Sequence, residues 1–264
     1  MAHTGTPQER AYILGVGVSA INMKMAVEII EGWIERREPH YVCVTGVHGV
    51  MESQRDPALR AIHNRAGLVT PDGMPLVWLS RLKGFAHVER VYGPDLTLAL
   101  CERAAQRGYR HFFYGGAPGV PEALAAELTR RFPGLQVAGT FSPPFRPLTP
   151  EEDEEVVRMI NAAEADIVWV GLSTPKQERW MADHVGRLTA PVLIGIGAAF
   201  DFLTGRKPQA PRWMQQAGLE WLFRLLTEPR RLWRRYLVNN PLFLTLIALE
   251  MLGIRQSEPT SPGS

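Results

Sequence analysis

Two polar residues in the first third of the chain each follow an apolar run that suits a strand. Thr45 ends the run YVCVT, and Asp72 follows LVTP. A carboxylate at a strand end is well placed to act as a general base, and a nearby hydroxyl can orient a substrate. Both residues also have a structural interpretation, because Asp72 before Gly73 suits a turn or helix cap and Thr45 can satisfy loop backbone. His48 is compatible with an ordinary packed or surface histidine.

Two glycine-containing loops could approach a phosphorylated ligand. Gly115 and Gly116 follow the run RHFFY and precede a predicted helix, so backbone amides at a helix N-terminus could face a phosphate. Further along the chain, Gly197 would allow close backbone approach, and Asp201 could bind ribose hydroxyls. Neither loop matches a dinucleotide or P-loop fingerprint, and glycines also serve tight turns and tight packing.

The segment 171–178, GLSTPKQE, carries the richest mixture of polar groups. Two hydroxyls and a proline open a predicted helix, and Lys176, Gln177 and Glu178 then offer a cation, an amide and a carboxylate. These side chains could contact a nucleotide-sugar. The same pattern resembles a capping box, in which a hydroxyl and a Gln or Glu satisfy the first amides of a helix.

Short apolar runs alternate with amphipathic segments through residues 1–205. This alternation predicts an α/β domain, with a Rossmann-like, largely parallel sheet and helices on both faces. Ligands of such sheets bind outside the carboxyl ends of the strands, where the motifs above lie. The predicted strands are AYILGVGV, YVCVTG, AGLVTP, YRHFFYGG, LQVAGTF, ADIVWVGL and APVLIGIG, and the predicted helices span 23–36, 94–107, 120–132, 150–163 and 175–187.

The C-terminal part of the chain differs from the rest in charge. Residues 206–235 hold eight Lys or Arg and two Asp or Glu, a net charge of +6; the remaining 21 of 29 basic and 25 of 27 acidic residues give −4 elsewhere. Such segregation predicts an anionic partner. We expect residues 206–250 to form a basic, amphipathic, membrane-associating appendage, and residues 251–264 to be disordered. Short helices should be broken at Pro208, Pro211, Pro229 and Pro241, with Trp213, Trp221, Phe223 and Trp233 exposed.

Composition and cysteine usage favour a cytoplasmic protein. Of the 264 residues, 45% are hydrophobic and 21% charged, which is ordinary for a folded domain large enough to be an enzyme. Cys43 and Cys101 lie in apolar runs without metal-ligand spacing, as expected of buried thiols in a reducing compartment. The N-terminus lacks a signal-peptide pattern, and the apolar run 241–249 is too short to span a bilayer.

The sequence carries no Asp-x-Asp motif or local His/Asp/Glu cluster that suits a divalent ion. A diphosphate leaving group would then need arginines, which Arg90 and the C-terminal segment can supply. We therefore expect no metal and no cofactor.

Several motifs in a fixed order resemble the WecG/TagA/CpsF family of bacterial glycosyltransferases. They are VTPDGMPLVW, ERVYGPDL, FFYGGAPG and GLSTPKQE, followed by the segment that begins GIGAAFDFLTGRKPQAP; the resemblance covers roughly residues 10 to 245. It implies inverting, metal-independent transfer of a sugar from a UDP-sugar to a polyprenyl-diphosphate-linked sugar at the cytoplasmic face of the membrane. The donor sugar would be N-acetylmannosamine-like or another hexose, and the products would feed teichoic acid or other cell-surface polysaccharides.

The resemblance also implies residue roles. The family's proposed base falls on Asp72, its active-site threonine on Thr45 and its pocket arginine on Arg90. Three arginines thought to close over the diphosphates fall on Arg224, Arg231 and Arg234. Many members carry Thr-x-Asn where this chain has Val47, which leaves the donor sugar open and raises the question whether His48 replaces the amide.

The implied partners are the UDP-sugar, the lipid-linked acceptor and an anionic inner-membrane surface. A second copy of the chain is left open as a partner, and no nucleic acid is expected. Two other interpretations are compatible with parts of the sequence. One is a nicotinamide-dependent oxidoreductase, although the dinucleotide fingerprint is absent. The other is a non-catalytic nucleotide- or nucleic-acid-binding protein whose basic segment grips phosphates. Turnover of UDP-sugars separates the enzyme from the binder.

Overall fold

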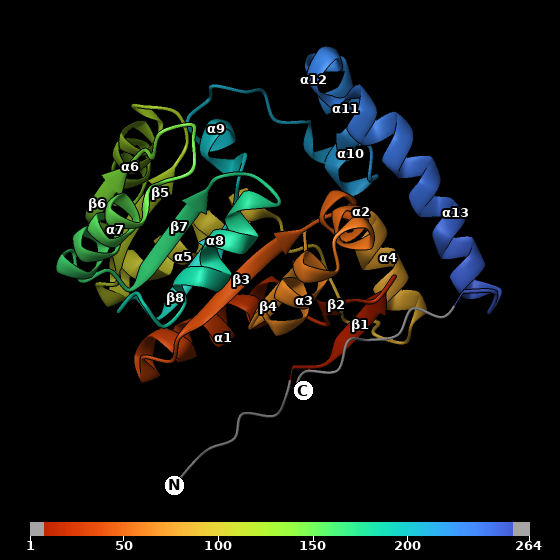
Figure 1. Cartoon of the computed structure of the whole chain (residues 1–264), viewed down its shortest axis with the longest axis horizontal. Coiled ribbons are helices and arrows are strands. Elements are labelled where there is room, and N and C mark those ends of the chain that lie inside the picture. The colour runs from red at the N-terminus through yellow and green to blue at the C-terminus, as the bar shows by residue number, and fades with distance from the viewer. Residues whose placement is uncertain (1–7, 256–264) are drawn as a thin grey trace, which may run out of the picture.

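The computed structural model describes residues 8–255, and its centre is a six-stranded parallel sheet. The strands lie in the order β4-β3-β8-β7-β5-β6, so the carboxyl ends of β3, β7 and β8 are neighbours in the middle of one sheet edge (Figure 1). The predicted α/β fold with a largely parallel sheet is confirmed. The strand bounds are β3 (His40–Thr45), β4 (Leu68–Pro71), β5 (Arg110–Gly115), β6 (Gln136–Phe141), β7 (Ile167–Gly171) and β8 (Val192–Gly195).

Helices cover both faces of this sheet because successive strand residues point to opposite sides. On β3, Cys43 belongs to one buried apolar cluster and Val42 to the other. The first cluster lies under α2 (Val47–Arg55), α3 (Pro57–Arg65), α7 (Pro150–Ala162) and α8 (Lys176–His184). The second lies under α1 (Met23–Arg36), α5 (Gly93–Arg107), α6 (Val120–Arg131) and α9 (Ala199–Leu203).

Two parts of the N-terminal half differ from the sequence-based prediction. The run AYILGVGV was predicted as one strand, but it forms an antiparallel hairpin of β1 (Arg10–Ile13) and β2 (Val16–Ser19). Leu14 and Gly15 both have positive φ, the backbone that a two-residue hairpin turn requires. The structure also contains α2, α3 and α4 (Met74–Leu82), which were not predicted. As a result, Thr45 and Asp72 stand at the N-terminal ends of helices instead of in open loops.

The chain beyond Gly205 forms a helical appendage that lies along one side of the sheet domain (Figure 1). Helices α10 and α12 begin next to or at Pro211 and Pro229, as predicted, whereas Pro241 does not break a helix. It lies in the first turn of α13, where a missing N–H is tolerated. The elements are α10 (Arg212–Gln216), α11 (Glu220–Thr227), α12 (Pro229–Trp233), the π-helical turn η1 (Arg234–Val238) and α13 (Asn239–Met251).

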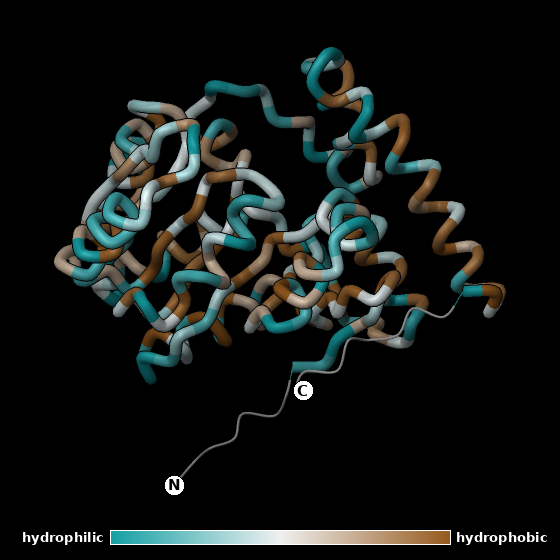
Figure 2. Tube along the Cα trace, viewed as in Figure 1, coloured by the Kyte–Doolittle hydropathy of each residue, from teal (hydrophilic) through white to brown (hydrophobic). Residues whose placement is uncertain are grey.

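Helix α13 is largely apolar (Figure 2). Phe243 and Ile247 are buried in the core cluster under α2, and several other apolar residues of the helix are exposed. No helix within residues 8–255 is long and apolar enough to cross a bilayer. The predicted disordered segment 251–264 falls mostly on residues 256–264, which lie outside the described residues; Met251 ends α13.

Candidate active site

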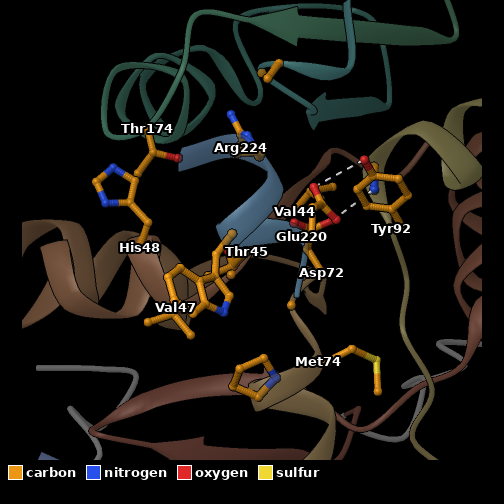
Figure 3. A pocket seen from close by; sticks show the side chains of 18 of the residues that line it. Val44, Thr45, Val47, His48, Asp72, Met74, Tyr92, Thr174, Glu220 and Arg224 are labelled. Carbon is orange, nitrogen blue, oxygen red and sulfur yellow. Dashed lines mark hydrogen bonds between the residues drawn. The ribbon is translucent and has the colours of Figure 1, made fainter. Parts of the chain in front are cut away.

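A cavity of about 360 Å³ lies between the carboxyl edge of the sheet and the appendage. The N-terminal ends of α2 and α4 form one wall, and residues of α11, α12, η1 and α13 form the other. Figure 3 shows Thr45, His48, Asp72 and Met74 of the first wall with Glu220 and Arg224 of the second. This is the edge at which open α/β sheets bind ligands. The predicted site residues that line the cavity are Thr45, Asp72, Arg90, Gln177, Gly197, Arg224 and Arg231.

Asp72 is held by hydrogen bonds at the carboxyl edge of the sheet, directly after β4. Its backbone N–H donates to the carbonyl oxygen of Thr45 (3.0 Å), and its Oδ1 accepts from the backbone N–H of Gly93 (3.1 Å). Burial raises the pKa of the carboxyl, and the positive charge of Arg90 partly opposes this. The carboxyl still opens onto the cavity. A carboxylate with a raised pKa takes up a proton more readily, which suits a general base.

Thr45 is fixed beside Asp72. Its Oγ1 donates to the carbonyl oxygen of Cys43 (3.2 Å), so the hydroxyl's donor is used within the protein and its lone pairs can accept from a ligand. Gly49, one helical turn further along, packs so closely that a Cβ there would lie 2.9 Å from Cγ2 of Thr45. A larger residue at position 49 would therefore displace the threonine.

Arg90 links the sheet domain to the appendage. Its Nε donates to the carbonyl oxygen of Asp72, and its Nη2 forms an ion pair with Glu220 of α11 (2.5 Å). The guanidinium also lies 4.0 Å from the centre of the Tyr92 ring. Tyr92 donates a hydrogen bond to Glu220 (3.4 Å), and the two side chains face each other in Figure 3. The arginine therefore joins the backbone of Asp72 to the carboxylate of Glu220.

Three arginines of the appendage line the cavity, and one of them, Arg235, was not predicted. Arg224 and Arg235 line the cavity, and the Nε of each is buried without a hydrogen-bond partner in the described part of the chain. Burial lowers the pKa of Arg235, as expected of a cation removed from water. Arg231, four residues before Arg235, also lines the cavity but is paired with Glu228 (2.6 Å). Arg234 is exposed, does not line the cavity and stacks on Trp233.

His48 lies in the first turn of α2, at the rim of the same cavity. Burial lowers its pKa to about 3, and the charges of Arg235, Arg55 and Arg224 add to this, so the ring is neutral near pH 7. Its Nδ1 is buried without a hydrogen-bond partner and lies 3.8 Å from a carboxylate oxygen of Glu52. Thr174 lines the same cavity. Val47 also lines the cavity and contributes only apolar surface.

The chain matches the model of the "Glycosyl transferase WecG/TagA/CpsF family" over residues 11–257. It belongs to this family. It is also 34% identical, over 196 residues, to the N-acetylglucosaminyldiphosphoundecaprenol N-acetyl-beta-D-mannosaminyltransferase of Bacillus spizizenii strain W23. That alignment covers 74% of each chain. The sequence resemblance to the WecG/TagA/CpsF family is confirmed, and the protein is a glycosyltransferase by family.

In this WecG/TagA/CpsF member, some residues of the segment 171–178 line the cavity and others hold the lining residues in place. Gln177 lines the cavity, and its Nε2 donates to the buried carboxyl of Glu178 (3.2 Å), which also accepts from Thr174 (2.7 Å). Burial raises the pKa of Glu178. Gly197 has positive φ, and a Cβ there would lie 3.2 Å from Oε1 of Gln177. Lys176 is exposed at the start of α8 and does not line the cavity.

Three other predicted site residues of this family member lie outside the cavity. A Cβ on Gly115 would approach the backbone of Gly171 to 2.7 Å, and one on Gly116 would meet Val120 at 3.1 Å. These glycines allow close packing of β5 against its neighbours. Asp201 forms an ion pair with Lys207 (3.1 Å) at the start of the appendage.

Sequence reasoning missed the cavity residues Glu220, Gln215, Tyr92 and Arg235. Glu220 was counted only as one of two acidic residues in a basic segment. Its position as an acidic residue among cations was the one local sign of a special role. Its ion-pair partner Arg90 lies 130 residues away in the sequence, so the pairing leaves no local pattern. Within residues 8–255, no group of three or more His, Cys, Asp or Glu side chains is arranged to hold a metal ion.

Proposed function

We propose that the protein is an inverting, metal-independent glycosyltransferase that moves a hexose from a UDP-sugar to a polyprenyl-diphosphate-linked sugar. The observation that carries this proposal is one cavity in which the Asp72 carboxyl, with its raised pKa, faces Arg224 and Arg235. A base on one wall and cations on the opposite wall are the groups that displacement of a nucleoside diphosphate needs.

The proposed reaction is a single displacement. Asp72 accepts the proton of an acceptor hydroxyl, and the hydroxyl oxygen forms a bond to the anomeric carbon of the donor. The bond from that carbon to the UDP oxygen breaks, and UDP leaves with the electron pair. Attack from the face opposite UDP inverts the anomeric configuration. Negative charge grows on UDP as the bond breaks, so cations that meet it in the transition state lower the barrier.

The acceptor assignment rests on the Bacillus relative, whose name specifies an N-acetylglucosaminyl-diphosphoundecaprenol acceptor and N-acetylmannosaminyl transfer. A lipid acceptor fits an enzyme that works at the cytoplasmic face of an anionic membrane. The appendage would supply the contact, since Arg230 and Arg234 are exposed beside Trp233. Basic and aromatic residues on one surface favour anionic lipid, at about 1 kcal/mol per cation.

The donor sugar is expected to be N-acetylmannosamine-like or a related hexose. The cavity presents the apolar side chain of Val47 where many family members carry an amide, and the neutral His48 ring is the nearest polar replacement. A neutral imidazole can both donate and accept a hydrogen bond, as an amide can. His48 would thus contact the donor.

A panel of UDP-sugars with a synthetic N-acetylglucosaminyl-diphosphate lipid tests the proposal. We expect release of UDP with one donor, and NMR of the product should show an inverted anomeric centre. Asp72→Asn protein, which should still bind UDP, serves as the matched control. A product with retained configuration, or equal turnover by the control, would contradict the proposed base. Salt-sensitive binding of RNA or DNA without any sugar transfer would favour the non-catalytic alternative.

A further inference from the structure

The cavity has an apolar end that the transfer reaction does not explain. Met74 and Trp78 of α4 line it on one side, and Phe243 and Leu244 of α13 line it on the other. Trp78 and Leu244 are nevertheless 45% and 66% exposed, so the cavity opens to solvent between these two helices. Large exposed apolar side chains beside a charged site are a signature of a binding surface.

Two apolar stripes continue outward from this opening. On α4, Met74, Trp78 and Leu82 follow at intervals of four residues, which places them on one face of the helix. On α13, Leu244, Ala248 and Met251 follow at intervals of four and three. Leu82 and Met251 at the outer ends are exposed. An ion pair between Lys83 and Glu250 (2.9 Å) joins the two helices near those ends.

We infer that this α4–α13 track binds the first isoprene units of the acceptor lipid. The inference rests on the proposed function, because it places the lipid of that acceptor. The cations Arg231 and Arg235 and the apolar residues Phe243 and Leu244 line the same cavity, so a diphosphate at the cations has an apolar path directly beside it. Eight residues of helix extend about 12 Å, enough for the start of the chain.

Recognition of the diphosphate group alone would not need an apolar track beside the arginines. The arginines would bind a diphosphate whatever its tail. Contact of an isoprenoid tail with Trp78 and Leu244 would add affinity, because it removes apolar surface from water. The track therefore predicts discrimination by chain length among soluble diphosphates. Attachment to a bilayer predicts no such discrimination in the absence of vesicles.

The decisive experiment measures binding without transfer, by calorimetry on the full chain in vesicle-free buffer. We expect farnesyl diphosphate, below its micelle concentration, to bind about tenfold more tightly than dimethylallyl diphosphate, the scale of burying a few methylene groups. Leu82→Ser, at the outer end of the track, should remove much of this difference and leave dimethylallyl diphosphate binding unchanged, whereas Leu244→Ser, at the cavity, should also weaken binding of the shorter ligand. Leu226→Ser is the matched control, because Leu226 is an equally exposed leucine of α11 that does not line the cavity.

The possible outcomes separate this inference from the proposed function. Equal affinity for the two diphosphates, or a preference that Leu244→Ser and Leu82→Ser leave intact, would overturn the lipid track. Variants that lose only vesicle binding would show that the stripes contact the bilayer. A chain-length preference in protein that transfers no sugar would leave the track standing and overturn the glycosyltransferase mechanism. Sugar transfer that does not depend on the length of the lipid would overturn the lipid track and leave the glycosyltransferase mechanism standing.

Discussion

The two walls of the cavity are built in different ways. On the sheet side, Thr45, Asp72 and Gln177 stand at strand ends or on the first turn of a helix, and each is held by hydrogen bonds to nearby protein groups. On the appendage side, Arg224 and Arg235 project from helices, and their Nε atoms have no hydrogen-bond partner among residues 8–255. In the proposed reaction, the sheet wall would hold its groups in place for the chemical step, and the appendage wall would gain hydrogen-bond partners when a diphosphate binds.

The largest effect should come from the sheet wall. Asp72→Asn keeps the shape of the side chain but removes the base, so we expect kcat to fall by about 100-fold or more. Calorimetry should show unchanged UDP binding, and thermal unfolding should show an intact fold. Turnover near that of the wild type with saturating acceptor would show that the proton leaves by another route, and the division of labour between the walls would fail.

In the appendage, Arg235, which lines the cavity, and Arg234, which does not, provide a matched pair of adjacent arginines. Arg235→Gln removes a cavity cation, and we expect kcat to fall by about 100-fold, the scale of one lost transition-state donor. Arg234→Gln removes an exposed cation and should lower turnover of a soluble acceptor by no more than about twofold. Steady-state kinetics on both variants checks this. Equal losses, or a larger loss for Arg234, would support the diphosphate-binding role that the sequence predicts for Arg234.

Arg235→Gln should leave the free energy of unfolding unchanged or raise it. The wild-type Arg235 guanidinium is largely buried and its Nε has no partner, which costs free energy in the folded state. Functional sites commonly retain such unfavourable groups. Denaturant unfolding of Arg235→Gln should therefore give a free energy of unfolding equal to or above the wild-type value. A clear loss would show that this arginine supports the fold.

These contrasts also show what the sequence could and could not predict. Thr45 and Asp72 were found because apolar runs mark strands, and the carboxyl ends of parallel strands meet at one edge. Arg235 was missed because the register of α12 and η1 against the sheet depends on tertiary packing and on a π-helical turn, neither of which leaves a local signal. Helix α2 was missed because Gly49 weakens its helical pattern, although that glycine is needed beside Thr45.

An intermediate effect is expected where the two walls meet. Burial raises the pKa of Asp72, and the carboxylate of Glu220 raises it further, while Arg90 and Arg224 lower it. Glu220→Gln removes a negative charge and frees Arg90 to attract Asp72 more strongly, so the pKa of Asp72 should fall. We expect kcat to drop about tenfold, because the base is weaker and Arg90 less well positioned. The acid limb of the pH–rate profile should move to lower pH.

Arg212→Gln is the control variant that tests whether Glu220→Gln acts only by loosening the docking of the appendage. That variant breaks another ion pair between the appendage and the sheet domain, Arg212 with Asp95 (2.7 Å), outside the cavity. Its pH profile should match the wild type. If both variants shift the acid limb alike, Glu220 acts only by holding α11 in place; if neither shifts it, Glu220 has no influence on the base.

The smallest effect should follow the removal of divalent ions. In the proposed reaction, the charge on departing UDP is met by Arg224 and Arg235, cations that α11 and η1 already place at the cavity. Because these guanidiniums are positioned before the reaction, excess EDTA should change kcat by less than about twofold. The test gains force in combination with Arg235→Gln. If Mg²⁺ restores that variant but does not stimulate the wild type, a metal ion can replace the appendage wall but is not normally used. Strong stimulation of the wild type by Mg²⁺ would instead assign the leaving group to a metal and leave the appendage arginines with acceptor binding alone.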